Sequence, residues 1–208
     1  MEQMNRISAT TLEAYRLFLT EDWMDYDRLA AQLGGEREET DAMRRGTSLH
    51  QILEVPQKKR AVCFGKDTYT HLGFVWDAAE VDAIASEGIN EIKAEYPITP
   101  DTILVAKADN IHGLAVTDYK TTTGSFSADK YLASVQWKIY CLAFDATQFT
   151  YRVLEIKDGD IQHIKAEHAL TCRPYPGMKE EIATLTADFI TFCREHGFTQ
   201  AITPRKPA

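Results

Sequence analysis

A run of three predicted β-strands in the middle of the chain constrains the fold most, because short turn sequences separate the strands. Apolar residues on either side of this run recur at helical spacing. The resulting order of helices, strands, helix, hairpin and helix predicts an α+β or mixed α/β fold with helices on the faces of a sheet. Strands are expected at 92–98, 102–109, 114–120, 148–156 and 161–167, and helices at about 9–19, 22–33, 40–54, 77–87, 127–144 and 177–196.

Length and composition suit one compact domain with a small helical elaboration, since 208 residues with 44% apolar content are enough to bury a core. No apolar stretch approaches the ~18 residues that a membrane span needs. The first residues also lack the basic-then-apolar layout of a secretory signal. We therefore expect a soluble, cytoplasmic protein with no membrane partner.

The net charge of −8 argues against a surface coated in basic charge for non-specific binding of nucleic acid. A local basic patch is still expected, because the charged residues of 41–60 sum to +3. The basic residues there are Arg44, Arg45, Lys58, Lys59 and Arg60. The four cysteines form no Cys-x-x-Cys pair, so neither a tetrathiolate zinc site nor a disulfide-stapled minidomain is expected.

The predicted hairpin around His112-Gly113 places two carboxylates near each other. If these two residues form the turn, Asp109 faces Val116, and Asp109 and Asp118 become diagonal neighbours roughly 5.5–8 Å apart. Two such carboxylates can share a divalent cation, and oxygen ligands favour Mg²⁺ or Mn²⁺. Lys120 on the same face would suit phosphoryl chemistry, since an ammonium can orient water or stabilise developing charge. An ordinary solvated hairpin face has the same pattern, so spacing alone leaves both interpretations open.

Asp109 followed by Asp118-Tyr119-Lys120-Thr121-Thr122 resembles the core of the PD-(D/E)XK nucleases, in particular the RecB, RecE and lambda-exonuclease group. The segment from Gly46 to Glu54, with His50, resembles the first motif of that group. Gln136-Trp-Lys-Ile-Tyr140 resembles its Gln-x-x-x-Tyr motif, and the pieces occur in the family's order. One departure is Ala106, where the family often has glycine. Another is the short connection from Asp109 to Asp118.

The resemblance implies a restriction-endonuclease-like core, with a central mixed sheet flanked by helices and an N-terminal helical elaboration. The whole chain, 1–208, would be one nuclease domain. Its parts would be an N-terminal helical part at 1–60 that carries the first motif, the catalytic sheet and helix at 90–170, and the C-terminal helix at 175–197.

The resemblance also implies a role for each matching residue. His50, Asp109, Asp118 and the backbone carbonyl of Tyr119 would bind the metal, while Lys120 would position or help to deprotonate the attacking water. For His50, the alternative is an ordinary core histidine. Members with an iron–sulfur cluster carry closely spaced C-terminal cysteines, which this chain lacks, so no such cluster is expected.

Further polar residues are candidates for accessory roles. Gln136 and Tyr140 lie four residues apart and share a helix face, so they could contact DNA phosphate or the catalytic residues. Glu95, on the neighbouring strand, could enter the metal shell. Arg44 and Arg45 precede His50 on its helix and could meet the DNA backbone. Each of these residues could equally be an ordinary exposed helix or strand residue.

These observations predict a metal-dependent deoxyribonuclease that uses Mg²⁺ or Mn²⁺. The favoured form is an exonuclease that acts on duplex ends in recombination or DNA processing. Besides DNA, a second copy of the chain or a recombination protein is a possible partner, and the small size suggests a phage origin. Three alternatives stay open: a structure-specific endonuclease of the same fold, a catalytically silent module that binds DNA or protein, and an unrelated α+β enzyme.

Overall fold

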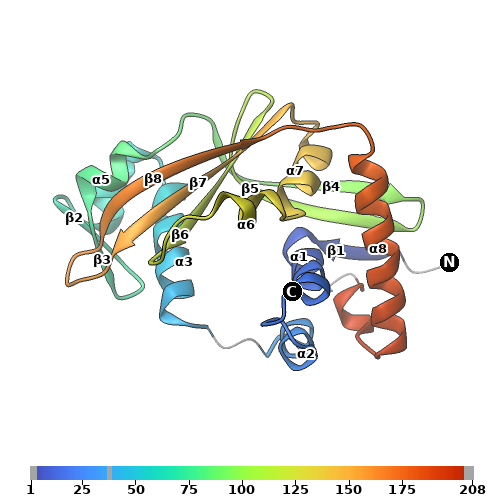
Figure 1. Cartoon of the computed structure of the whole chain (residues 1–208). Coiled ribbons are helices and arrows are strands. Elements are labelled where there is room, and N and C mark those ends of the chain that lie inside the picture. Colours follow the sequence, from blue (N-terminus) through green and yellow to red (C-terminus); the bar gives the residue numbers. More distant parts are fainter. Residues whose placement is uncertain (1–3, 37–38, 204–208) are drawn as a thin grey trace.

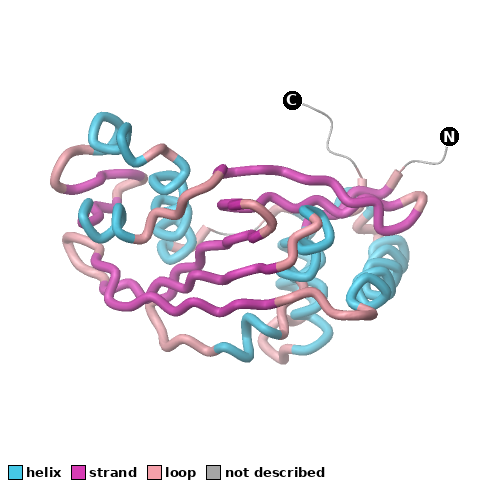
Figure 2. Tube along the Cα trace, turned by 90° about the horizontal axis from the view of Figure 1, so that it is seen from above, coloured by secondary structure: helices cyan, strands magenta, loops and turns pink. Residues whose placement is uncertain are grey.

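The computed structural model describes residues 4–36 and 39–203. Its centre is a mixed β-sheet that helices flank, as the sequence predicts (Figure 1). A small β2–β3 hairpin and α5 lie at one end of the molecule, and α8 lies at the other (Figures 1 and 2). Among the described residues, no helix combines the length and the apolar character that crossing a membrane would require.

The main sheet runs in the order β1-β5-β6-β7-β8, with β4 paired to β5. β5 is antiparallel to β4 and β6, while β7 is parallel to β6 and antiparallel to β8. The parallel β6–β7 pair requires a crossover connection, which α6 and α7 make. The strands are β1 (Asn5–Ser8), β2 (Thr68–His71), β3 (Phe74–Asp77), β4 (Ile89–Thr99), β5 (Thr102–His112), β6 (Ala115–Thr122), β7 (Gln148–Lys157) and β8 (His163–Cys172).

Short polar side chains fix where several helices begin. Ser8, Asp25, Thr40 and Asp77 each accept a hydrogen bond from the backbone N–H three residues later, which satisfies a donor that the first helical turn leaves free. The helices are α1 (Ala9–Thr20), α2 (Tyr26–Gly34), α3 (Asp41–Glu54), α4 (Gln57–Phe64), α5 (Ala78–Ala83), α6 (Ala128–Leu132), α7 (Gln136–Phe144) and α8 (Met178–Glu195), followed by a 3-10 turn at Thr199–Ala201.

Two buried clusters hold helices against the sheet. The first includes Ile139 of α7 and Phe189 of α8, and the second includes Leu49 of α3. The consecutive β7 residues Val153 and Leu154 belong to different clusters, as expected when side chains alternate between the two faces of a sheet. Each large apolar side chain that is fully buried contributes about 1.5–3 kcal/mol.

The expected helix over 127–144 is in fact two helices, α6 and α7. The break has a tertiary cause: the carboxylate of Glu13 accepts hydrogen bonds from Ser134 Oγ and Val135 N, at 3.0 and 2.8 Å, and so caps α7 from α1. The four-residue strand β1 was not predicted, because it is short and pairs with the distant β5. Residues 61–76, ambiguous from sequence, contain the end of α4 and most of the β2–β3 hairpin.

The hairpin between β5 and β6 turns one residue later than expected. His112 pairs with Ala115, so the turn residues are Gly113 and Leu114 rather than His112 and Gly113. Gly113 has a φ of 59°, which glycine adopts at little cost in the first position of such a turn. The ladder extends to Asn110–Thr117, so Asp109 comes into line with Asp118 rather than with Val116.

Candidate functional site

The candidate site lies where β5 and β6 separate. The ladder between the two strands ends at Asn110–Thr117. Beyond it, Tyr119 N–H donates a hydrogen bond of 2.7 Å to Asp109 Oδ2, so a side chain of β5 takes the place of a backbone partner. The fork therefore fixes the Asp109 carboxylate against the segment of β6 that carries Asp118 and Lys120.

Asp118, which is buried, forms an ion pair with the partly exposed Lys120 in this fork. Lys120 Nζ lies 2.7 Å from Asp118 Oδ2, and only 4% of the Asp118 side chain is exposed. Burial raises the pKa of Asp118, which the positive charge of Lys120 opposes. Burial lowers the pKa of Lys120, but the carboxylates of Asp118 and Asp109 outweigh this effect and raise it. Lys120 therefore carries a charged ammonium at neutral pH.

His50 reaches the same place from α3. Its Nδ1 lies 3.4 Å from Asp109 Oδ2. Burial lowers the pKa of His50, but the hydrogen bond and the charge of Asp109 outweigh this and raise it. Burial raises the pKa of Asp109, but the contact with His50, the charge of Lys120 and the hydrogen bond from Tyr119 N–H together outweigh it and lower the pKa of that carboxyl. The structure thus brings His50, Asp109, Asp118 and Lys120 together.

Gly46 allows α3 to lie close to β6. A Cβ built at Gly46 would be 3.0 Å from Thr121 Oγ1, tighter than an ordinary van der Waals contact. A Cβ there would require the Thr121 side chain to shift, at a point one helical turn before His50. Gly46 and His50 thus lie on the same helix, and the close packing of Gly46 against β6 helps to set the position of His50.

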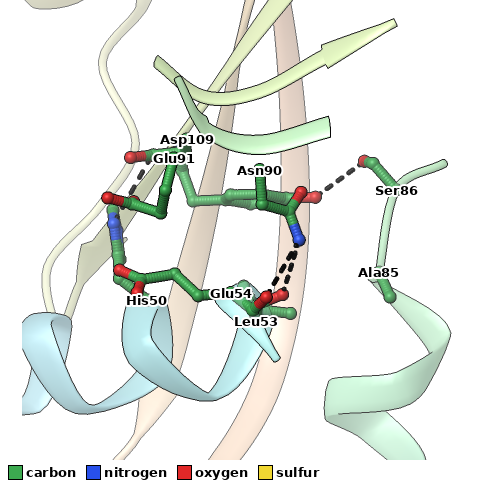
Figure 3. Close-up of a pocket in the computed structure, with 9 residues that line it drawn as sticks. His50, Leu53, Glu54, Ala85, Ser86, Asn90, Glu91 and Asp109 are labelled. Carbon is green, nitrogen blue, oxygen red and sulfur yellow. Dashed lines mark hydrogen bonds and ion pairs between the residues drawn. The ribbon is translucent and has the colours of Figure 1, made fainter. Parts of the chain in front are cut away.

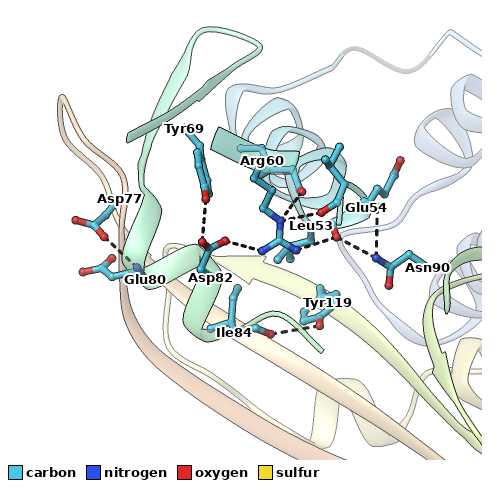
Figure 4. Close-up of polar contacts among 12 residues, drawn as sticks. Leu53, Glu54, Arg60, Tyr69, Asp77, Glu80, Asp82, Ile84, Asn90 and Tyr119 are labelled. Carbon is cyan, nitrogen blue, oxygen red and sulfur yellow. Dashed lines mark hydrogen bonds and ion pairs between the residues drawn. The ribbon is translucent and has the colours of Figure 1, made fainter. Parts of the chain in front are cut away.

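Arg60 fixes the other end of α3. This buried side chain donates hydrogen bonds to the carbonyl oxygens of Ile52, Leu53 and Val55, at the C-terminal end of the helix (Figure 4). Its guanidinium also pairs with Asp82 at 2.8 Å. Arg60 counted toward the basic patch expected at 41–60, but here it is internal and 2% exposed.

Tyr119 contacts the site through its backbone N–H, which binds Asp109; the ligand role expected for its carbonyl stays a prediction. Its side chain belongs to the second core cluster, and its hydroxyl donates to Ser86 Oγ at 2.7 Å. Tyr140 also lies near the site, since Asp118 and Asp109 add to the effect of burial in raising its pKa. The Tyr140 hydroxyl donates to Lys107 O at 2.8 Å, so it holds α7 against β5. Gln136 lies one helical turn away, at the start of α7.

Three predicted accessory residues are placed away from this group. Glu95 forms an ion pair of 2.6 Å with Arg6. Arg45 is buried and pairs with Asp158 at 2.7 Å, contrary to the exposed position that contact with DNA would need. Arg44 is more exposed, but its guanidinium lies 5.8 Å from the Phe74 ring and donates to Leu72 O. Both arginines therefore help to hold α3 to neighbouring segments.

Sequence reasoning missed two acidic residues, Glu91 and Glu54. Both line a pocket of about 10 Å³ with His50 and Asp109, roughly the room that one water molecule needs (Figure 3). Glu91 lies between the pairs Asn90–Asn110 and Ile92–Ala108, directly across from Asp109. The turn at 99–101 predicts this register, so pairing the two strands outward from the turn would have identified Glu91.

The donor set of the fork suits a hard divalent cation. His50 offers an imidazole nitrogen, and Asp109 and Asp118 offer carboxylate oxygens. Asp118 Oδ2 is buried and has no hydrogen-bond partner among the described residues apart from its ion pair with Lys120. A cation would offset the cost of holding these carboxylates out of water.

Asp77, Glu80 and His163 form a separate cluster whose potential ligand atoms lie within 4.8 Å of one another. These side chains already have protein partners. Asp77 Oδ1 accepts from Glu80 N, and Glu80 Oε2 accepts from Ile164 N at 2.7 Å. The cluster caps α5 and attaches β8 to it, which accounts for its geometry.

Comparison with known proteins supports the fold. No family model matches the sequence, and no curated protein matches it. Among solved structures, SSO0001 has a TM-score of 0.54 at 16% identity, over 92% of this chain and 78% of that one. An alkaline exonuclease from Laribacter hongkongensis has a TM-score of 0.50 at 12% identity, over 92% and 89%. A protein from Eubacterium rectale has a TM-score of 0.51 at 10% identity, over 99% and 84%. At sequence identities this low, the TM-scores show a shared fold and nothing finer.

Proposed function

We propose that this protein is a metal-dependent deoxyribonuclease of the PD-(D/E)XK type, similar to the RecB and lambda-exonuclease group. One observation carries the proposal: His50, Asp109, Asp118 and Lys120 converge where β5 and β6 separate. These are the residues that the sequence motifs single out. The structural likeness to an alkaline exonuclease favours an exonuclease that acts on DNA ends.

In this proposal, His50, Asp109, Asp118 and the Tyr119 carbonyl hold Mg²⁺ or Mn²⁺. When bound, the metal would lower the pKa of a water molecule and stabilise charge on the phosphate. Lys120 acts as a charged ammonium, because the neighbouring carboxylates raise its pKa. It therefore orients the attacking water and stabilises the phosphate oxygens, rather than accepting a proton. The Asp109 carboxylate stays ionised, because its contact with His50 lowers its pKa.

The test uses end-labelled linear duplex and a closed circular duplex in Mg²⁺, Mn²⁺ or EDTA. We expect metal-dependent loss of the linear substrate, with the circle left intact. Lys120→Met should reduce the rate by roughly 10²-fold or more, because it removes a charge that stabilises the transition state. The control is Lys165→Met, a lysine with 70% exposure whose contact with Glu155 is 3.7 Å.

Cleavage of the circular duplex would mean that the same site acts as an endonuclease and not as an exonuclease. Absence of cleavage of either substrate by the wild-type protein in every metal would contradict the proposed activity. Equal losses in Lys120→Met and Lys165→Met would contradict the role of Lys120.

A further inference from the structure

We propose that Glu91 supplies an additional carboxylate to the metal at the fork, and that Lys107 is the counter-ion of Glu91 when no metal is bound. This inference rests on the proposed function. It concerns a residue outside every motif that the sequence resemblance covers.

The pairing of β4 with β5 places Glu91 at the fork. Glu91 falls at the register position opposite Asp109, between the pairs Asn90–Asn110 and Ile92–Ala108, although the two residues are not themselves paired. In Figure 3 the side chains of Glu91, Asp109 and His50 approach one another from β4, β5 and α3. Glu95, the residue expected from sequence, lies four residues further along the same strand and forms an ion pair with Arg6.

The backbone at Glu91 departs from a regular strand. Its φ is 59°, a left-handed value that is uncommon for a residue other than glycine. The alternation of faces breaks at this point in the partner strand as well. Ala108 and Ile111 both pack against the first core cluster, although they lie an odd number of residues apart. This strained local conformation accompanies a carboxylate that lines the pocket.

Glu91 has one charged partner where it lies. Its side chain is 21% exposed, and its buried Oε2 forms an ion pair with Lys107 Nζ and has no further hydrogen bond among the described residues. The charge partner of Glu91 is Lys107, its diagonal cross-strand neighbour, whose side chain is 61% exposed. A long exposed lysine can turn into solvent at little cost, because its flexible side chain carries a strongly hydrated ammonium. Lys107 therefore neutralises Glu91 without closing the site.

Charge balance supports the assignment. With a neutral His50 as ligand, Asp109 and Asp118 against the Lys120 ammonium leave the fork one negative charge. The Glu91 carboxylate adds a second negative charge, and Glu54, which lines the same pocket, adds a third. The acidic groups around the fork therefore suffice to neutralise a divalent cation in a site where charge is poorly solvated.

The experiment measures Mn²⁺ binding to the full chain by calorimetry, without DNA, so that its readout does not depend on activity. Glu91→Gln should weaken binding by roughly tenfold, as loss of a carboxylate at or around a metal does. Lys107→Gln should bind Mn²⁺ at least as tightly as wild type, because it removes the competing cation. Glu95→Gln is the matched control, a glutamate of the same strand with its own ion pair, and should leave affinity unchanged.

Unchanged affinity in Glu91→Gln would overturn the inference, as would an equal loss of affinity in Glu91→Gln and Lys107→Gln. The second result would mean that the pair is merely a structural contact between strands. If Glu91→Gln does not fold, Lys107→Gln decides alone, and weakened binding would overturn the inference. A wild-type protein that neither binds Mn²⁺ nor cleaves DNA would refute the proposed function itself. Cleavage by the wild type with unchanged Mn²⁺ affinity in Glu91→Gln would refute this inference alone.

Discussion

At the scale of single residues, Asp118 lowers the stability of the metal-free fold in a position suited to bind a metal. Its carboxylate is almost fully buried, its pKa is raised by that burial, and its partner is the Lys120 ammonium of the same strand. A carboxyl group whose pKa is higher in the folded than in the unfolded protein ionises more easily in the unfolded chain. Its ionisation therefore destabilises the fold as the pH rises above the unfolded pKa. The charge of Asp118 is therefore a cost to the metal-free fold.

Asp118→Asn should accordingly leave the melting temperature in EDTA no lower than that of wild type, because it removes a poorly solvated charge. Wild type should gain about 2.7 kcal/mol at Mn²⁺ concentrations near 100 times Kd, and the variant should gain almost nothing. Thermal unfolding with and without Mn²⁺ measures both effects. An Mn²⁺-induced gain in Asp118→Asn equal to that of wild type would exclude Asp118 as a ligand.

At the scale of elements, α3 is held at both ends. Gly46 allows its close approach to β6, and Arg60 satisfies the carbonyl groups at its C-terminal end. Asn90 of β4 adds a hydrogen bond of 3.1 Å to Leu53 O. The position of His50 relative to the fork therefore depends on residues that do not touch a metal.

Arg60→Met should lower the free energy of unfolding by about 3 kcal/mol, because it leaves buried carbonyl groups and the Asp82 carboxylate without their partner. The matched control is Arg44→Met. That guanidinium is more exposed and its pair with Asp41 is 3.3 Å long, so the expected loss is about 0–1 kcal/mol. Urea denaturation of both variants measures the difference. Equal losses would contradict the proposed role of Arg60 at the end of α3.

At the scale of the whole molecule, sequence predicted what depends on local patterns. Alternation and turn residues predicted strands β4 to β8, but not β1, β2 or β3. The motifs indicated His50, Asp109, Asp118 and Lys120. Contacts distant in sequence were not predictable in this way. Glu13 interrupts the expected helix at 127–144 from more than a hundred residues away. The sequence alone gives no sign that Arg45 forms an ion pair with the distant Asp158.

The fork itself could not be read from regular strand geometry. Alternation assumes an unbroken strand, whereas β5 and β6 separate after Asn110–Thr117 and the opposing Glu91 has a left-handed backbone. These two departures from regular strand geometry determine where the carboxylates of Asp109 and Glu91 lie. The overall architecture, with helices on a mixed sheet, supplies the rigid frame that holds strands, α3 and α7 around them (Figure 1).

A crystal structure of the protein soaked with Mn²⁺, with anomalous diffraction recorded to locate the metal, tests the central claim most directly. We predict a strong anomalous peak between His50, Asp109 and Asp118, with Lys120 displaced from Asp118 Oδ2. A peak confined to the Asp77–Glu80–His163 cluster, or no peak at the fork in Mn²⁺ concentrations that support cleavage, would contradict the assignment of the metal centre.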